Sequence, residues 1–204
     1  MVAALNKTSL RQQRDQLALY ERFLPSLDLK RQQLIADLKR AREVLRAVER
    51  EIDQRMSSQS GLFSLLGASE QDLSGLVRVV SVIVVEENVL GIQVPVLKDV
   101  QFRVAEYSML ARPFWVDLLV ELLQELGNLR IRLRVERERV RRLGDAVRRI
   151  TQRVNLFEQV LIPRAQETIR HIRVYLADAE RAAVIRSKIA KTRQRHDAPR
   201  REDI

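Results

Sequence analysis

Cysteine is absent from the 204-residue sequence, which excludes every site that needs a thiol. Disulfide bonds, thiolate metal ligands and a cysteine nucleophile cannot be built from these residues. Histidine is almost as scarce, since His171 and His196 are the only two, too few for a histidine-rich metal site. We therefore predict no metal-binding residue and no cofactor.

Glycine and aromatic residues are also rare. Six glycines and 4% aromatic residues stand against 31% charged residues, a composition typical of long exposed helices and not of a compact globule. The sequence has no glycine-rich phosphate loop and no nucleophile placed beside a base. We therefore predict no catalytic residue, and a protein that is not itself an enzyme.

Long apolar runs are missing too. The first residues, MVAALNKTSL, lack the apolar core of a signal peptide. Arg78 and the Glu86–Glu87 pair interrupt or end the most apolar stretch, so no run reaches the roughly 20 residues that span a membrane. The prediction is a soluble, cytoplasmic protein without direct membrane insertion.

What the sequence does contain is a long apolar repeat toward its C-terminal end. Residues 113–195 are predicted to form a single helix of roughly 80 residues, about 120 Å long at 1.5 Å per residue. Over more than five heptads from Leu122, eleven of twelve core positions are apolar and Glu136 is the exception. Such spacing is typical of a coiled-coil seam. Pro163 is expected to bend the helix, and beyond it the seam slips by one residue and continues to Ala190.

The first fifty residues carry a matching repeat, so they are predicted to be the partner helix. Asn6 or Thr8 can cap its start. Pro25 predicts a kink or a short break near Leu24, and Arg31 is a polar break in the repeat that can fix its register. The predicted fold is mainly α: a long antiparallel two-helix coiled coil of the N- and C-terminal helices, with a small central β-hairpin and a short helical connector. The predicted seam includes Leu17, Leu38, Leu45, Leu129, Leu143, Ile150 and Val154.

The middle of the chain has a different pattern. Residues 76–97 are rich in β-branched side chains and contain the polar break Glu-Glu-Asn, so they predict two strands and a turn. Gly91 and Pro95 indicate that the second strand is irregular or lies at an edge, and Trp115 is expected to pack against the hairpin. The predicted segments are an N-terminal coiled-coil helix at 1–56, a connector and hairpin at 57–112 with strands within 76–97, a C-terminal coiled-coil helix at 113–196, and a flexible tail at 197–204.

The net charge of +10 is carried by the two helices. Residues 1–56 hold 12 Lys and Arg against 8 Asp and Glu, residues 113–204 hold 21 against 13, and residues 57–112 hold 4 against 6. The excess is densest from Arg130 to Arg153, with ten arginines and three acids. One interpretation is a solvated coil surface with intrahelical pairs such as Glu138–Arg142. The other is a surface that faces an acidic partner or nucleic acid.

Three stretches resemble the D subunit of the V-type and A-type rotary ATPases, the family of the central rotor shaft. The most specific is TQRVNLFEQVLIPRAQETIRHIRVYLADAERAAVIRSKIAK, from Thr151 to Lys191. In the hairpin, Asn88, Gly91 and Pro95 are similar to the family's Asn-x-x-Gly-x-x-x-Pro. The N-terminal match is looser, at Asn6-Lys7-Thr8 and Leu29-Lys30-Arg31, and YERFLP (20–25) departs from the family pattern. The residues that match in the first stretch are Arg153, Val154, Asn155, Glu158, Ile162, Pro163, Thr168, Ile169, Ile172, Leu176, Glu180 and Arg181.

The resemblance implies a mechanical role. A shaft of this family couples ATP hydrolysis or synthesis in a catalytic hexamer to rotation of a membrane ring and to H⁺ or Na⁺ transport. Its implied partners are the catalytic and non-catalytic subunits of the hexamer, the small F subunit of the rotor and the adaptor subunit on the membrane ring, with no nucleic acid, and its place is peripheral to the membrane within the ATPase complex. Hexamer contacts are hypothesised at Arg11, Arg14, Arg186, Lys188, Lys191 and Arg193.

Two alternatives stay open at this point. A basic coiled coil could bind nucleic acid or act as a scaffold, which steeply salt-dependent binding to duplex DNA would indicate. The stalk of a secretion-export ATPase has a similar architecture, but a plain helical hairpin would not need the segment NVLGIQVPVL at 88–97.

Overall fold

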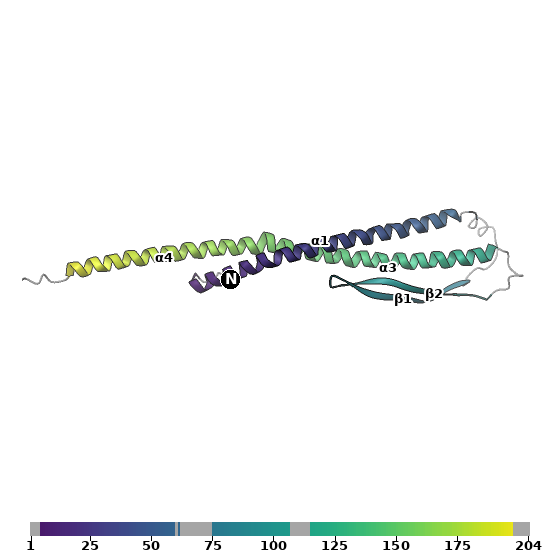
Figure 1. The fold of residues 1–204 in the computed structure, drawn as a ribbon, viewed down its shortest axis with the longest axis horizontal. Coiled ribbons are helices and arrows are strands. Elements are labelled where there is room, and N and C mark those ends of the chain that lie inside the picture. Colours follow the sequence, from purple (N-terminus) through teal and green to yellow (C-terminus); the bar gives the residue numbers. More distant parts are fainter. Residues whose placement is uncertain (1–4, 60, 62–74, 107–114, 198–204) are drawn as a thin grey trace, which may run out of the picture. The chain divides into compact units, whose positions relative to one another are not determined.

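A computed structural model describes residues 5–59, 61, 75–106 and 115–197 of the chain (Figure 1). In this part of the chain, a long N-terminal helix and a long C-terminal helix flank an antiparallel hairpin, so the predicted fold class is confirmed. Most of the predicted helical connector, Pro113 and residues 198–204 of the predicted tail lie outside the described residues. Asp197, the first residue of the predicted tail at 197–204, is instead the last residue of the long C-terminal helix. No described helix is both long and apolar enough to cross a membrane. The elements are α1 (Lys7–Ser58), β1 (Val77–Val89), β2 (Ile92–Val104), α3 (Trp115–Leu156), the π-helical turn η1 (Phe157–Leu161) and α4 (Ile162–Asp197).

Helix α1 starts at the predicted cap and continues through its internal proline. Asn6 Oδ1 accepts a hydrogen bond of 2.6 Å from the Ser9 N–H, which satisfies a donor of the first turn. Pro25 lies inside the helix without ending it, so a break near Leu24, one of the two predicted outcomes, is wrong. A proline removes one backbone hydrogen bond and has a helical φ, which the turns on either side of Pro25 tolerate.

The chain divides into two compact units, and each is described by itself. The first unit combines residues 1–28 with residues 152–204, and the second contains residues 29–151. Both units pair a segment of α1 with a segment of the C-terminal helices.

The second unit is built on an antiparallel seam between α1 and α3. Val48 and Ile52 of α1 pack with Leu129 and Leu133 of α3. Arg55 pairs with Glu125 at 3.4 Å, and Glu49 pairs with Arg137 at 3.1 Å. Residue numbers therefore rise along one helix as they fall along the other, as the prediction requires. The buried seam positions follow the heptad: they are three, four or seven residues apart on α1, at Leu34, Leu38, Ala41, Val48 and Ile52, and seven apart on α3, at Leu122, Leu129, Glu136, Leu143 and Ile150.

The hairpin turn lies at Leu90 and Gly91, beyond the predicted position at residues 86–88. Leu90 has φ 53° and Gly91 has φ 86°, and two successive positive φ angles define a type I′ turn, whose twist suits a two-residue hairpin loop. Asn88 Oδ1 closes the loop by accepting a 2.7 Å hydrogen bond from the Gly91 N–H. The predicted turn at Glu-Glu-Asn is wrong, because all three residues belong to β1 and pair with β2.

Both strands are also longer than the pattern indicated. β2 runs to Val104 and not to Leu97, so the limit of 76–97 for the strands is wrong at its far end. Asp99 and Gln101 read as connector residues, yet they occupy the exposed side of a strand whose alternate residues, Val100 and Phe102, are half-buried. Lys98 lies at the register shift opposite Ile83 and Val84. A one-sided strand carries polar residues on its solvent face without loss.

The start of α3 packs against the base of the hairpin through apolar side chains. Leu76 and Val77 at the base of β1 pack against Trp115, Val116 and Leu119. The Ala105 N–H donates to the Leu76 carbonyl at 2.9 Å and closes the base. Trp115 is therefore a packing anchor, as predicted, while the neighbouring Phe114 lies outside the described residues.

Gly127 allows α3 and β2 to approach closely. A Cβ added at this position would lie 2.9 Å from Cε1 of Phe102, whereas a Cβ at Gly144 on the same helix would meet nothing within 4 Å. The two glycines thus share a helix and differ in what surrounds them.

Substituting alanine at Gly127 and at Gly144 should separate the effect of packing on the free energy of unfolding from the effect of helix propensity. Gly144→Ala is expected to raise the free energy of unfolding by about 0.8–1 kcal/mol, because alanine is the better helix former. Gly127→Ala gains the same propensity but forces Phe102 to move, at a cost of about 1–3 kcal/mol, so it should be less stable than Gly144→Ala. Urea unfolding monitored by circular dichroism measures both. Equal stabilisation of the two variants would contradict the close approach.

The first unit contains the seam slip, and a π-helical turn causes it. The Ile162 N–H bonds to the Phe157 carbonyl, five residues back, instead of the four of an α-helix. Such a turn holds one extra residue. Buried Val154 is accordingly followed by buried Ala165, Ile169 and Ile172, each one position later than an uninterrupted heptad would place it. The slip predicted from the sequence has its physical cause here, immediately before Pro163.

The seam of the first unit ends earlier than predicted. Leu176 is half-buried, but Ala179, Ala183 and Ala190 are exposed, so the predicted continuation to Ala190 is wrong. The reason is the partner helix, since Lys7 at the start of α1 already pairs with Glu180 at 3.4 Å. Beyond that level α1 offers no residue against which α4 can pack.

The one-residue slip predicts which side chains of α4 lie in the seam and stabilise the coil. Ile172 is 0% exposed, so Ile172→Ala should lower the free energy of unfolding by about 2–5 kcal/mol through a cavity. Tyr175 would lie in the seam without the slip but is 49% exposed, and Tyr175→Ala should cost well under about 1 kcal/mol. Thermal unfolding of both variants gives the comparison. A larger loss for the tyrosine variant would show that the seam keeps its earlier phase.

Candidate functional site

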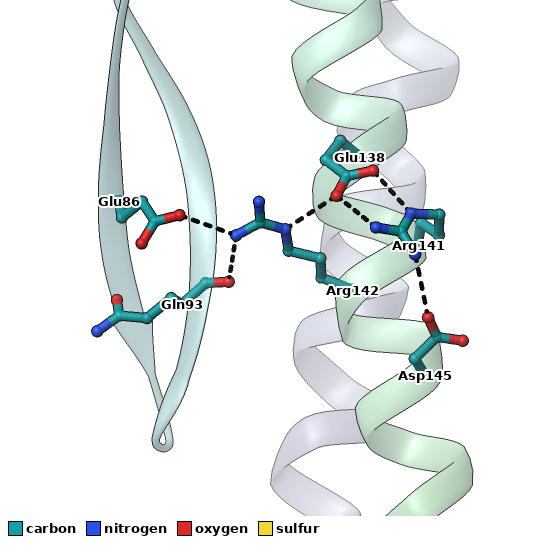
Figure 2. A network of polar contacts seen from close by, with 6 residues as sticks. All are labelled: Glu86, Gln93, Glu138, Arg141, Arg142 and Asp145. Carbon is teal, nitrogen blue, oxygen red and sulfur yellow. Dashed lines mark hydrogen bonds and ion pairs between the residues drawn. The ribbon is translucent and has the colours of Figure 1, made fainter.

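Arg142 is the polar residue that fastens the hairpin to the coil (Figure 2). Its Nη1 donates to Glu86 Oε1 of β1 at 3.1 Å and to the Gln93 carbonyl of β2 at 3.0 Å. Its Nε donates to Glu138 Oε1 on its own helix at 2.9 Å. Nearby, Arg139 pairs with Glu87 at 3.5 Å. Two arginines of α3 thus hold both strands close to the turn of the hairpin.

Glu138 is shared between Arg142 and its neighbour Arg141. Arg141 donates to both carboxylate oxygens, at 2.6 and 2.7 Å, and also reaches Asp145 at 3.4 Å. The hydrogen bonds from Arg141 and then from Arg142 lower the pKa of Glu138 from 4.5 to about 2, because they favour the ionised carboxylate. The same contacts raise the pKa of both guanidinium groups, so the network is fully charged near neutral pH.

The lowered pKa of Glu138 predicts a defined acid sensitivity. A carboxylate whose pKa is lower in the folded chain stabilises the fold above the unfolded pKa of 4.5 and loses that contribution as the pH falls toward about 2. Glu138→Gln should therefore flatten the dependence of the unfolding midpoint on pH between about 4.5 and 2. Circular dichroism melts across this range test it, with Glu121→Gln, an exposed carboxylate on the same helix, as the matched control. An unchanged slope in Glu138→Gln would contradict the network.

The structure places the predicted seam residues in the interiors of the two units. Leu143, Val154, Ile150, Leu38 and Leu129 are buried. Leu17 and Leu45 are half-buried, as is Arg31, the polar break predicted in the same repeat. Glu136 is buried at 8% exposure, and its Oε2 has no hydrogen-bond partner among the described residues.

The hairpin residues lie close together. Asn88 bonds to Gly91 as described above, while Pro95 is buried and pairs in register with Glu86. Pro95 is thus next to the carboxylate that Arg142 binds, so these three residues and the arginine network belong to the same end of the hairpin.

The six basic residues predicted to contact a hexamer lie in the first unit. Arg11 and Arg14 belong to the first turns of α1, and Arg14 shares a shallow groove with Arg170 and Arg173 of α4. All six side chains are exposed, and none has an ion pair within the described part of the chain. The other members of the set are Arg186, Lys188, Lys191 and Arg193, all on α4.

The end of α4 is a single helix with a mixed surface. Every side chain from Ala183 to Arg193 is exposed. Val184, Ile185 and Ile189 are 55%, 57% and 49% exposed, and they alternate with the basic residues named above. Aliphatic side chains exposed together on a helix indicate a surface that contacts another molecule.

Metal binding depends on how the His, Asp and Glu side chains of the described residues are grouped. No group of three or more His, Cys, Asp or Glu side chains lies close enough to hold an ion in this part of the chain. His171 is exposed on α4, and the side chain of His196 lies outside the described residues.

Comparison with known families decides the relationship. The family described as the D subunit of ATP synthase matches residues 9–192. The chain belongs to this family of ATP synthase D subunits. Relatives of this D subunit are named as the D subunit of V-type ATP synthase. The one from Borreliella burgdorferi is 31% identical over 191 residues, which cover 92% of this chain and 93% of the relative. The one from Chlamydia muridarum is 36% identical over 200 residues, covering 94% and 96%.

The family assignment confirms the resemblance seen between Thr151 and Lys191, and it places this D subunit in a V/A-type ATPase. Sequence reasoning missed the residues that anchor its hairpin. The intrahelical pair Glu138–Arg142 was predicted and is present. The bond from Arg142 to Glu86 joins residues 56 apart in the sequence. The only signal for it in the sequence is that two acids, Glu86 and Glu87, interrupt an otherwise apolar strand.

Proposed function

We propose that this D subunit is the central rotor shaft of its ATPase and that it has no catalytic role of its own. In this role the two-helix coil transmits rotation between the catalytic hexamer and the membrane ring, coupling ATP hydrolysis or synthesis to transport of H⁺ or Na⁺. The shaft is peripheral to the membrane, within the complex.

The single helix at the end of α4 is the observation that carries the proposal. Glu180 of α4 pairs with Lys7, the first residue of α1. From Glu180 to Asp197, α4 continues for about 25 Å at 1.5 Å per residue. Its surface combines exposed aliphatic and basic side chains, of which Ile185 and Arg186 are neighbouring examples. A rotating contact needs a surface that is attracted to several sites in turn and locks onto none, and exposed cations with scattered aliphatic residues meet this need.

The coil supplies the stiffness that a shaft needs. In each unit two helices share an apolar seam, and the ion pairs Glu49–Arg137, Arg55–Glu125 and Lys7–Glu180 cross between helices. Paired helices resist bending and twisting more than a single helix, because any distortion must break knobs-into-holes contacts along the seam.

The proposal assigns partners to different parts of the chain. The catalytic and non-catalytic subunits of the hexamer surround the end of α4 and the first turns of α1. The small F subunit of the rotor contacts the hairpin and α3 between Leu122 and Ile150, and the adaptor subunit connects the hairpin end to the membrane ring.

Removing the end of α4 tests the proposal. In the assembled complex, deletion of residues 186–204 should leave ATP hydrolysis partly intact and lower ion pumping by a larger factor, because the shortened shaft loses its contact with the ring of subunits. ATP hydrolysis and ion uptake are measured on the same membrane vesicles. Deletion of residues 198–204 alone leaves α4 whole and is the matched control. An unchanged ratio of ions moved to ATP hydrolysed in the longer deletion would refute the role.

A further inference from the structure

The structure separates the ten arginines between Arg130 and Arg153 into two groups. Four are occupied by carboxylates of the same unit: Arg137, Arg139, Arg141 and Arg142. The other six are exposed, and no ion pair involves them within the described residues: Arg130, Arg132, Arg134, Arg148, Arg149 and Arg153. A cation that balances no charge in its own chain is available to a partner.

Three of these unoccupied arginines, Arg130, Arg134 and Arg148, lie along one side of α3. Arg130 and Arg134 are seven and three residues before Arg137, and Arg148 is eleven residues after it. At 100° per residue these positions fall within an arc of about 60° that also contains Arg137. The hairpin-binding residues Arg139 and Arg142 point elsewhere, and Figure 2 shows Arg141 and Arg142 leaving the helix in different directions. The three arginines remain exposed, although Gly127, seven residues before Arg134, meets Phe102 of the hairpin.

Helix α1 extends the same surface across the seam. The Glu49–Arg137 ion pair of 3.1 Å shows that these two residues lie on the same side of the seam. Arg46 and Arg42, three and seven residues before Glu49, are its neighbours on that side of α1, and both are exposed without an ion pair in the described residues. We call Arg42, Arg46, Arg130, Arg134 and Arg148 the basic track. On α3 it is about 27 Å long.

We propose that the basic track binds an acidic face of a partner protein in the stalk assembly. The inference rests on the proposed function and adds to it the chemistry of one contact. Guanidinium groups favour carboxylates because they bind them through two parallel hydrogen bonds. Glu49 lies within the track and Asp53 follows one turn later, so a uniformly negative phosphate backbone complements the track less well than a protein face that carries a basic group among its acids. The track also lacks the aromatic side chains on which bases stack, so the charge pattern fits a protein and not a nucleic acid.

Charge reversal on the track is the first test. Arg42→Glu with Arg134→Glu is compared with Lys98→Glu and Arg132→Glu, which make the same change in net charge at exposed residues without an ion pair in the described chain. Arg132 is two residues from Arg134 and thus faces the other side of α3. Complexes purified with each variant are analysed by native mass spectrometry at increasing salt. The track variant should lose one acidic subunit at a salt concentration where the wild-type and control complexes keep it, with an apparent affinity at least about tenfold lower.

A photocrosslinker at Gly144 identifies what lies against the track. Gly144 is seven residues from Arg137, on the same side of α3, and has open space around it. Crosslinking in the intact complex should join it to a Glu- or Asp-rich segment of another subunit, and charge reversal of the track should abolish the product. Crosslinks to a neutral or basic segment, no crosslink, or binding of a DNA duplex that depends on the track would overturn the inference.

The two proposals fail in different ways. If the chain is found in the coupled complex but the track and control variants behave alike, only the basic track is refuted. If the deletion of residues 186–204 leaves coupling unchanged, the shaft proposal fails, and a partner that still depends on Arg42 and Arg134 would preserve the track as an assembly surface.

Discussion

The apolar seam between antiparallel helices is the contact on which the rest of the described chain depends. A helix satisfies its own backbone hydrogen bonds but cannot bury its own apolar stripe, so each unit depends on the pairing of α1 with the C-terminal helices. Leu34 and Leu143 in the second unit, and Val154 and Ile172 in the first, are almost completely inaccessible to water. Because the seam occupies only one side of α3, the other sides remain available for different tasks.

Helix α3 therefore serves several contacts at once. One part of its surface carries the seam, Gly127 and Arg142 receive the hairpin, and the arginines of the basic track remain exposed. Neighbouring residues reach different sides because successive positions are separated by about 100°, so Arg141 and Arg142 share Glu138 and still point to different surroundings. Glu138 keeps two cations in place, and neither guanidinium is free to swing across to the other side.

The sequence predicts those features that depend on a single helix side, and it predicts poorly those that depend on contacts between distant residues. The seam and its one-residue slip were visible because apolar spacing is local, and the π-helical turn beside Pro163 then explains the slip. The hairpin turn was misplaced because Glu86 and Glu87 look like turn residues until Arg142 and Arg139 are seen to bind them. The sequence of α4 could not predict that the seam ends near Leu176, because the seam ends where α1 begins.

The unpaired end of α4 has a consequence for how such a subunit gains its final rigidity. From Glu180 to Asp197 the helix has no companion among the described residues, so it lacks the packing that supplies most helical stability in proteins. Ile185 and Ile189 add a tendency to adhere to any apolar surface. Under the proposed function, the subunits that surround the end of α4 also shield Ile185 and Ile189 from water and hold the helix in place. Folding of this last segment is then coupled to assembly of the complex.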